Sequence, residues 1–299
     1  FEVGMSKAGE IKKLSNIIKP HIGVITNIGE AHIENFKNIN GIASAKSEII
    51  EKIEKGGTII LNKDDKFFNF LYKKAKTSNL KICSFGIQKK ADIFLEKLIR
   101  TEETSELYLK INNRKISFKI KDLNIYNVLA AIAVLNVLKL DLKKIQTILK
   151  NLELSEGRGK KHLISRYNKK FKLIDESYNA NPLSVKNAIK NLSLLKKKKF
   201  KKYLLLGDML ELGAKSKKYH EELSKVINNS DIDKVFVKGK KSIFTYKHLK
   251  KGKRGNMLQN EEDIELILEK MISNNDYLMI KGSNATGLHN LSKKMIRGT

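Results

Sequence analysis

Leu173-Ile174-Asp175-Glu176-Ser177-Tyr178-Asn179-Ala180-Asn181-Pro182 is the stretch that decides the fold. An apolar run ends in two carboxylates, crosses a turn rich in Asn and reaches a Pro that can open a helix. The stretch therefore predicts a buried strand end, a polar loop and a helix start, and ligands of open α/β sheets bind at such strand ends. Asn and Asp are also common in ordinary loops, but similar polar clusters follow two other predicted strands, at Asn27 and Asp208.

The sequence that follows this stretch alternates between strand-like and helix-like segments. Strands are predicted near 171–175, 203–207, 233–237 and 277–281, with helices at 183–195, 217–228, 261–273 and 285–296. This alternation is typical of a Rossmann-like α/β unit. The segment Glu156-Gly157-Arg158-Gly159-Lys160 is the predicted linker before it, which divides the chain into residues 1–156 and residues 157–299.

The first part of the chain predicts a mostly parallel sheet with a small antiparallel patch. Strand-like segments occur at 1–3, 22–27, 58–61 and 81–85, and a helix at 41–55 is expected to bury one face, made of Ile42, Ala45, Ile49 and Ile53. Three short strands at 93–95, 106–111 and 115–120 follow, the last two joined by a hairpin at Asn112-Asn113. Helices at 124–138 and 142–152 complete this part, and the predicted fold class is α/β throughout.

Composition predicts a folded protein without a membrane span. The chain has 299 residues, of which 41% are hydrophobic, and no apolar run reaches membrane-spanning length. Cys83 is the only cysteine, so no internal disulfide can form, and its apolar neighbours predict a small buried side chain in a reducing cytoplasm. No signal peptide opens the chain. Because the chain begins inside a strand-like segment, we expect it to be a fragment whose N-terminal part is missing.

The formal charge of +28 raises the hypothesis of nucleic-acid binding. The excess is nearly all lysine, however, and it is spread over the whole chain. Its densest run, Lys196 to Lys199 with Lys201 and Lys202, has no interleaved aromatic residues and predicts a solvated loop. We therefore predict no nucleic-acid partner, although a positive field would attract anionic substrates such as nucleotides.

Candidate metal and nucleotide ligands concentrate in the first half. Glu2 and His32 combine a carboxylate with an imidazole, which suits a divalent cation, although a single loop histidine is more often a surface residue. Lys46 either extends along its helix to solvent or turns toward phosphates. Asn124 and Asn127 begin a predicted helix, where Asn124 suits a cap and Asn127, beyond the cap, could pair with adenine.

Three further motifs lie in the second half. Gly157-Arg158-Gly159 places a guanidinium between two flexible residues, which suits phosphate binding on domain closure but is also compatible with a mobile linker. Gly207 to Gly213 with His220, and Lys281 to Asn284, follow predicted strands and could bind a small polar substrate, although Gly-rich βα turns are common. The phosphate-binding pattern GxxxxGK[ST] does not occur in the sequence.

Taken together and in order, these segments resemble the Mur ligase family. The matching segments are Glu2-Val3-Gly4 with Gly9-Glu10-Ile11, Thr26 to His32, Ala45 to Ile49, Asn124 to Asn127, Gly157-Arg158, Ser177 to Pro182, Gly207 to Gly213 with His220, and Lys281-Gly282-Ser283. Tyr178 to Pro182 and Gly207 to Gly213 are the specific ones. They resemble the branch of the family that adds D-alanyl-D-alanine to UDP-N-acetylmuramoyl-tripeptide.

The resemblance implies an architecture and a reaction. Of three family domains, this chain would hold most of the central ATPase domain and all of the last, so the first domain and the family's P-loop would lie upstream and the fragment alone would be inactive. The implied reaction is ATP-dependent amide formation through an acyl phosphate in peptidoglycan precursor synthesis, and hence in cell-wall biogenesis, cell shape and cell division. The implied protein is a cytoplasmic monomer that is not inserted into a membrane.

The resemblance also implies roles for individual residues. The implied ligands of Mg²⁺ are Glu2, His32 and Lys46, the last matching a family lysine that is often carbamylated, and the implied catalytic residues are Lys46, His32 and Arg158. ATP would be contacted by Asn127, Arg158, Asp175, Glu176, Tyr178 and Asn181. The peptide substrates would be contacted by Asn27, Asp208, Glu211, His220, Lys281, Ser283 and Asn284.

One departure from the family and two alternative functions are open at this point. The family usually has paired aspartates where this chain has Asp175-Glu176, so the contact with the ATP ribose would be altered or carried by Asp175. The first alternative is a sister ligase, either another Mur ligase or a folylpolyglutamate synthase-type enzyme. The remote alternative is a non-enzymatic basic protein that binds nucleic acid.

Overall fold

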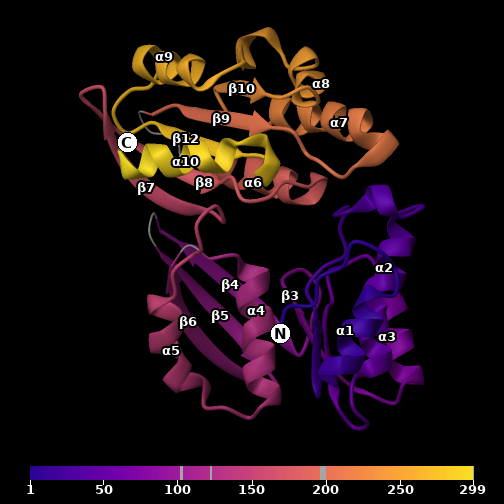
Figure 1. The fold of residues 1–299 in the computed structure, drawn as a ribbon. Helices are drawn as coiled ribbons and strands as arrows, with labels where there is room; N and C mark the ends of the chain where they lie inside the picture. Colours follow the sequence, from indigo (N-terminus) through magenta and orange to yellow (C-terminus); the bar gives the residue numbers. More distant parts are fainter. Residues whose placement is uncertain (102–103, 122, 196–199, 299) are drawn as a thin grey trace. The chain divides into compact units, whose positions relative to one another are not determined.

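The computed structural model describes residues 1–101, 104–121, 123–195 and 200–298, so the predicted lysine loop at 196–199 lies outside the described residues. Contacts divide the chain into two units. The first comprises Phe1–Ile28 and Asn35–Glu153, and the second comprises Gly29–Glu34 and Leu154–Thr299. Within the described residues each unit contains one six-stranded sheet with helices beside it, which confirms the predicted α/β class (Figure 1).

The sheet of the first unit has its strands in sequence order. These strands are β1 (Ile22–Ile25), β2 (Thr58–Asn62), β3 (Lys81–Gly86), β4 (Ile93–Arg100), β5 (Thr104–Ile111) and β6 (Arg114–Lys121). The helices are α1 (Glu10–Ile18), α2 (Ile39–Ser47), α3 (Phe68–Thr77), α4 (Ile125–Val137) and α5 (Leu142–Asn151), with short 3₁₀ helices η1 (Ile33–Asn35, which spans the boundary of the units) and η2 (Glu48–Lys52).

Strands β1 to β4 run parallel, whereas β5 and β6 are antiparallel to their neighbours. Every residue of β2 is buried, as expected for a strand covered on both faces, while burial alternates along β5, which is covered on one face. The β5–β6 hairpin turns at Asn112 and Asn113, both with positive φ, as a two-residue hairpin requires. The predicted antiparallel patch and its turn are therefore confirmed.

Two sequence-based predictions in this unit are wrong in detail. Residues 1–3 do not form a strand, because a strand exists only where its backbone is paired and no described strand pairs with them. The predicted helix at 41–55 becomes a 3₁₀ helix after Ser47. Because a 3₁₀ helix has three residues per turn, Ile50 and Ile53 share the buried face while Ile49 rotates partly out of it.

The second unit has the strand order β11-β10-β9-β12-β8-β7. Its strands are β7 (Lys160–Arg166), β8 (Lys169–Glu176), β9 (Lys202–Gly207), β10 (Lys234–Lys238), β11 (Arg254–Leu258) and β12 (Tyr277–Lys281). Its helices are α6 (Pro182–Leu194), α7 (Ser216–Asn228), α8 (Ser242–Lys247), α9 (Glu261–Met271) and α10 (Leu288–Arg297), with η3 (Gly213–Lys215), η4 (Lys251–Lys253) and η5 (Asn284–Thr286).

Reversal of the strand order places a switch point inside this sheet. The chain passes from β8 through β9 and β10 to β11 and then returns, so that β12 lies between β8 and β9. Helices α6, α7 and α8 pack in sequence on one another, whereas α9 and α10 share the core of the other face with Leu205, Leu278 and Ile280. The carboxyl ends of β8, β9 and β12 therefore lie where an open α/β sheet binds its ligands.

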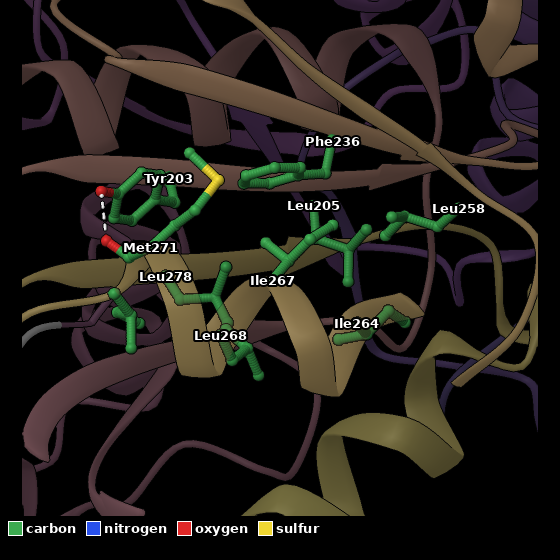
Figure 2. A pocket seen from close by; sticks show the side chains of 10 residues that line it. Tyr203, Leu205, Phe236, Leu258, Ile264, Ile267, Leu268, Met271 and Leu278 are labelled. Carbon is green, nitrogen blue, oxygen red and sulfur yellow. Dashed lines mark hydrogen bonds between the residues drawn. The ribbon is translucent and has the colours of Figure 1, made fainter. Parts of the chain in front are cut away.

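The core beneath α9 contains a small apolar cavity (Figure 2). Tyr203 and Phe236 lie on its sheet side and Leu268 on its helix side, and the Tyr203 hydroxyl donates a hydrogen bond to the Met271 carbonyl at 3.0 Å. The cavity has a volume of about 10 Å³ and is lined by apolar atoms. Because a water needs both more room and polar partners, this is a packing gap in the core rather than a ligand site.

Three elements of the second unit were not predicted, namely β7, α8 and β11. They are short or carry little periodicity, and β7 and β11 are edge strands whose pairing comes from the sheet. The predicted solvated lysine loop is also wrong at Lys202, which begins β9 and is fully buried. Its ammonium donates to the Ser193 carbonyl at 2.8 Å and lies 3.3 Å from Asp231 Oδ2, so its charge is matched within the protein.

Candidate functional site

The polar strand ends predicted for the second half of the chain come together in the second unit, whereas the one at Asn27 lies in the first unit. Lys281 at the end of β12 pairs in register with Glu176 of β8 on one side and with Leu206 of β9 on the other. Ser283 N–H donates to the Asp208 carbonyl at 3.0 Å, which joins the loops that follow β12 and β9. These three loops meet at the switch point of the sheet, and we take them as the candidate site of this unit.

Asp175 organises the first of these loops from beneath. It is fully buried, and its Oδ2 accepts a hydrogen bond from Gly157 N–H at 2.8 Å. Its Oδ1 accepts from both the N–H and the hydroxyl of Ser177. Both carboxylate oxygens are therefore occupied within the protein, and the predicted contact of Asp175 with ATP stays a prediction.

Arg158 and Tyr178 form the exposed part of this loop cluster. The guanidinium carbon of Arg158 lies 4.6 Å from the centre of the Tyr178 ring, a cation–π geometry. The Tyr178 ring in turn meets the edge of the His289 ring, with centroids 5.8 Å apart and planes at 88°. Tyr178 N–H donates to the Gly157 carbonyl, so residues 157 and 178 are joined through the backbone as well.

Asp175, Ser177 and His289 contain the residue types of a nucleophilic triad but not its order. In such a triad histidine lies between serine and the acid. Here Ser177 lies in the middle, because its hydroxyl donates to Asp175 while His289 Nδ1 lies 3.0 Å from the same oxygen. The Ser177 proton thus points to a carboxylate rather than to a base, and all three side chains are buried. The cluster has a structural rather than a nucleophilic geometry.

Lys281 is a buried cation at the centre of the candidate site. Its ammonium donates to the Asn179 carbonyl at 2.7 Å and to the Glu176 carbonyl and carboxylate, each at 3.3 Å. Burial lowers the pKa of Lys281, and the Glu176 carboxylate opposes that effect. Lys281 therefore ties the end of β12 to the loop after β8, and Glu176 is the predicted ATP ligand that balances its charge.

Asp208 and Ser283 also hold the loops in place. The Asp208 carboxylate accepts from the backbone N–H groups of Lys241 and Ser242, at 3.0 and 2.7 Å. The Ser283 hydroxyl donates to the Ala180 carbonyl at 3.3 Å and accepts from Leu210 N–H at 3.0 Å. Asn181 caps α6 by accepting from Ser184 N–H at 2.9 Å. These predicted ligands are committed to backbone groups, whereas Asn284 is exposed.

His220 is fully buried in α7 and supports the loop after β9. Its Nδ1 donates to the Ser216 carbonyl at 2.8 Å, which leaves Nε2 to accept from Met209 N–H at 3.0 Å. Burial is the main cause that lowers the pKa of His220, since it disfavours the imidazolium. The neutral ring thus shapes the Asp208–Leu212 backbone, and its predicted contact with substrate stays a prediction.

Acidification is expected to destabilise the second unit through His220. Because its folded pKa lies below the ordinary 6.5, the unfolded state takes up the proton first. Its contribution to stability is complete above pH 6.5 and is lost as the pH falls through the folded pKa, by at most about 1.4 kcal/mol per pH unit. The free energy of unfolding is measured by urea denaturation at several pH values for the wild type and for His220→Gln. We expect it to depend less steeply on pH in the variant. An unchanged slope would contradict this role, and His248→Gln, at an exposed histidine after α8, is the control.

The segment Gly29–Glu34 belongs to the second unit and contacts the loop after β9. His32 Nδ1 forms an ion pair with Glu211, and Glu34 N–H donates to the Glu211 carbonyl at 3.2 Å. Glu211 adopts a left-handed backbone conformation, with φ of 59°. Two residues predicted for different tasks, His32 for metal and Glu211 for substrate, are therefore partners in this structure.

In the first unit, Lys46 lies against the end of β1. Its ammonium donates to the Asn27 carbonyl at 2.9 Å, so the half-buried side chain turns toward the predicted strand-end motif rather than along the helix to solvent. Burial lowers the pKa of Lys46, and Asp65 opposes this. Asp65 also accepts from Ile28 N–H at 2.8 Å. Burial therefore weakens the preference of Lys46 for its charged form, while Asp65 supports that form.

The start of α4 supports one of the two predictions made for its asparagines. Asn124 Oδ1 accepts from Asn127 N–H at 3.2 Å, so Asn124 is the helix cap. The Asn127 side chain is exposed and stays a predicted adenine ligand. Next to it, the Tyr126 hydroxyl donates to Asp64 at 3.1 Å, and burial, followed by Asp64, raises the pKa of Tyr126 to about 12.

The residues predicted to hold Mg²⁺ do not form a ready-made cation site. Glu2 is exposed in an irregular segment, His32 pairs with Glu211, and Lys46 binds a carbonyl. Within the described ranges, no group of three or more His, Cys, Asp or Glu side chains could hold a metal ion. Cys83 is buried as predicted, and burial, followed by Asp92, raises the pKa of its thiol to about 12. No helix in the described part of the chain is long and apolar enough to span a membrane.

Fold and site geometry together define a two-unit α/β protein whose second unit is Rossmann-like and brings three polar loops together at its switch point. Family models confirm the resemblance seen in the sequence: the Mur ligase middle domain matches residues 1–135, and the Mur ligase glutamate ligase domain matches residues 162–284. The chain belongs to the Mur ligase family.

Relatives and solved structures agree with this assignment. UDP-N-acetylmuramoyl-tripeptide–D-alanyl-D-alanine ligase of Rickettsia prowazekii (strain Madrid E) is 31% identical over 292 residues, covering 96% of this chain and 64% of the relative. The enzyme of that name from Bacillus subtilis (strain 168) is 31% identical over 301 residues, covering 99% and 64%. The crystal structure of MurF from Acinetobacter baumannii is 27% identical with a TM-score of 0.85, covering 98% of this chain and 63% of that one. The chain thus spans about two thirds of the length of these relatives.

Proposed function

We propose that the protein containing this chain joins D-alanyl-D-alanine to UDP-N-acetylmuramoyl-tripeptide with ATP, in the cytoplasmic synthesis of peptidoglycan precursors. The observation that carries the proposal is the likeness, over nearly the whole chain, to relatives that bear this activity in their names. A structure of MurF from Thermotoga maritima in complex with ADP shares the fold, with a TM-score of 0.85 at 23% identity. We propose that residues 1–156 are part of a central ATP-binding domain and that residues 157–299 are a C-terminal ligase domain. We propose further that the protein is a monomer.

The proposed reaction has two steps. The γ-phosphoryl group of ATP is transferred to a terminal carboxylate oxygen of the tripeptide, and ADP leaves. The amine of D-alanyl-D-alanine then attacks the acyl carbon, a C–N bond forms, the C–O bond to phosphate breaks, and the amine loses a proton. Because anions meet in the first step, exposed cations near the phosphates stabilise its transition state. We assign this role to Arg158, whose guanidinium is exposed, and Mg²⁺ bound with the ATP phosphates stays a prediction from the resemblance.

The surroundings of the predicted residues suggest how they divide the work. Side chains that are exposed, such as Arg158, Tyr178 and Asn127, are free to contact ATP. The dipeptide would lie against the loops after β9 and β12, where Asn284 is exposed while Asp208 and His220 hold the backbone. Lys46 would serve the reaction as a neutral amine or its carbamate, which its lowered pKa supports.

The proposal predicts a strict dependence on both substrates. The full-length protein should release phosphate from ATP only when the UDP-linked tripeptide and D-alanyl-D-alanine are both present, because an acyl phosphate forms on the first and is consumed by the second. Phosphate release is measured with each substrate omitted in turn, and with D-alanyl-D-alanine replaced by glutamate or by single amino acids. ATP turnover indifferent to the dipeptide would refute the proposal, while turnover that requires glutamate would indicate a sister ligase.

A further inference from the structure

We infer that His289 is a positioning residue that holds the Tyr178 ring and, through it, the guanidinium of Arg158. The inference rests on the proposed function, in which Arg158 contacts ATP. His289 lies in the first turn of α10 and is only 8% exposed, and it belongs to none of the motifs that the sequence singled out. Its ring meets that of the exposed Tyr178, which in turn lies under the Arg158 guanidinium.

The first contact, between Ser177 and His289, determines which ring nitrogen of His289 carries the proton. Ser177 has a single hydroxyl proton, which it donates to Asp175 Oδ1. The 3.0 Å contact between Ser177 Oγ and His289 Nδ1 therefore needs a proton from the imidazole, so Nδ1–H is the donor. Because Asp175 is fully buried and also holds Gly157 N–H, the acid orients Ser177 and Ser177 orients the ring.

The second link is the packing of His289 against Tyr178. Their rings meet edge to face, with centroids 5.8 Å apart and planes at 88°, a geometry that aromatic pairs prefer. Gly157 makes this close approach possible. A Cβ at that position would lie 2.6 Å from Tyr178 Cβ and 3.0 Å from His289 Cε1, and its φ of +73° also favours glycine. Gly157 thus lets Tyr178 and His289 approach each other closely, and we infer that the contact with His289 orients the tyrosine ring.

The third link is the guanidinium on that ring. Arg158 is exposed, and a long exposed side chain otherwise samples many rotamers. The ring centre at 4.6 Å restricts where the guanidinium lies, and the ring keeps its orientation because His289 abuts it. His289 thus acts on the nucleotide through Tyr178 and Arg158, without touching it.

Steady-state kinetics of the full-length protein test the inference. His289→Ala should lower kcat/KM for ATP about fivefold to tenfold, since the lost contacts preorganise the cation that is proposed to stabilise the transition state. His289→Asn should recover part of this loss, because its amide can still donate to the Ser177 hydroxyl. Ser292→Ala is the matched control: Ser292 is buried in the same helix and its hydroxyl has no hydrogen-bond partner among the described residues. An unchanged kcat/KM for ATP in His289→Ala, or an equal fall in Ser292→Ala, would overturn the inference.

A double-mutant cycle separates positioning from general destabilisation. In an Arg158→Ala background, His289→Ala should add little, less than about twofold, because the group it positions is gone. Full additivity would mean that His289 acts independently of Arg158 and would overturn the inference.

A spectroscopic readout keeps the inference apart from the proposed function. The ¹⁵N shifts of the His289 ring should show Nδ1 protonated, and an Nε2–H tautomer would overturn the inference whatever the enzyme does. If the wild type shows no ligation at all, the proposed function fails. The ring tautomer and the loss of Arg158 order on His289→Ala, measured by NMR of its side-chain Nε–H, then decide the inference alone.

Discussion

Replacing Asp175 with alanine is expected to lower the free energy of unfolding by about 3 kcal/mol. The fully buried carboxylate accepts hydrogen bonds from Gly157 N–H and from both donors of Ser177. Alanine would leave these donors without acceptors in a buried place, and it would remove the side-chain hydrogen bond that holds Gly157 to the end of β8. Chemical denaturation followed by circular dichroism measures the loss.

Two variants make the Asp175 prediction specific. Asp175→Asn keeps one carbonyl acceptor and should lose less stability than Asp175→Ala. Glu262→Ala removes an exposed carboxylate from α9 in the same unit and should change the free energy of unfolding by less than about 0.5 kcal/mol. A wild-type-like midpoint for Asp175→Ala would contradict the organising role given to this residue.

Replacing Arg158 with alanine is expected to lower kcat/KM for ATP about 100-fold in the full-length protein. The guanidinium is exposed and held over Tyr178, so it is available to an anion without prior rearrangement of its own support. Arg158→Lys should recover only part of the activity, because an ammonium neither stacks on the ring in the same way nor binds phosphate through two hydrogen bonds. Initial rates of phosphate release at varied ATP concentration measure both variants.

The control for Arg158 is another exposed arginine of the same unit. Arg297 lies in the last turn of α10 and carries the same charge, so Arg297→Ala tests whether loss of one positive charge suffices to reduce activity. We expect its kcat/KM to stay within about twofold of wild type, because distant exposed charges are screened by salt. Equal losses in the two variants would show that Arg158 contributes only to the overall field.

The regular elements were predictable because their residues carry local periodicity. The apolar runs of β2 and β9 predicted strands, and both strands are buried along their whole length. The segment of β5 also predicted a strand, and its burial alternates because one face is covered. Asn181 and Pro182 predicted the start of α6, which begins at Pro182 with a capping box formed by Asn181. Edge strands such as β7 escaped prediction, because their pairing depends on neighbours distant in sequence.

The candidate site was predictable as a set of motifs but not as a set of contacts. The sequence indicated Arg158, Tyr178 and Lys281, but it offered no signal for His289, which lies in an ordinary amphipathic helix. A histidine three residues before a helix-face serine has no local pattern that marks it as the partner of Ser177, 112 positions away along the chain. Equally, nothing local shows that Asp208 caps the start of α8.

From the sequence alone came the α/β class, the order of most elements, the family and the strand ends where polar chemistry gathers, because each depends on short-range periodicity and local turn chemistry. The tertiary structure decided which of those polar groups are committed to the protein itself. Asp175, Lys281 and His220 are buried and bonded, whereas Arg158 stays exposed on its tyrosine. Which of these polar side chains are buried, and which partners they find, is decided only when strands far apart in sequence pair. No local pattern could therefore encode it.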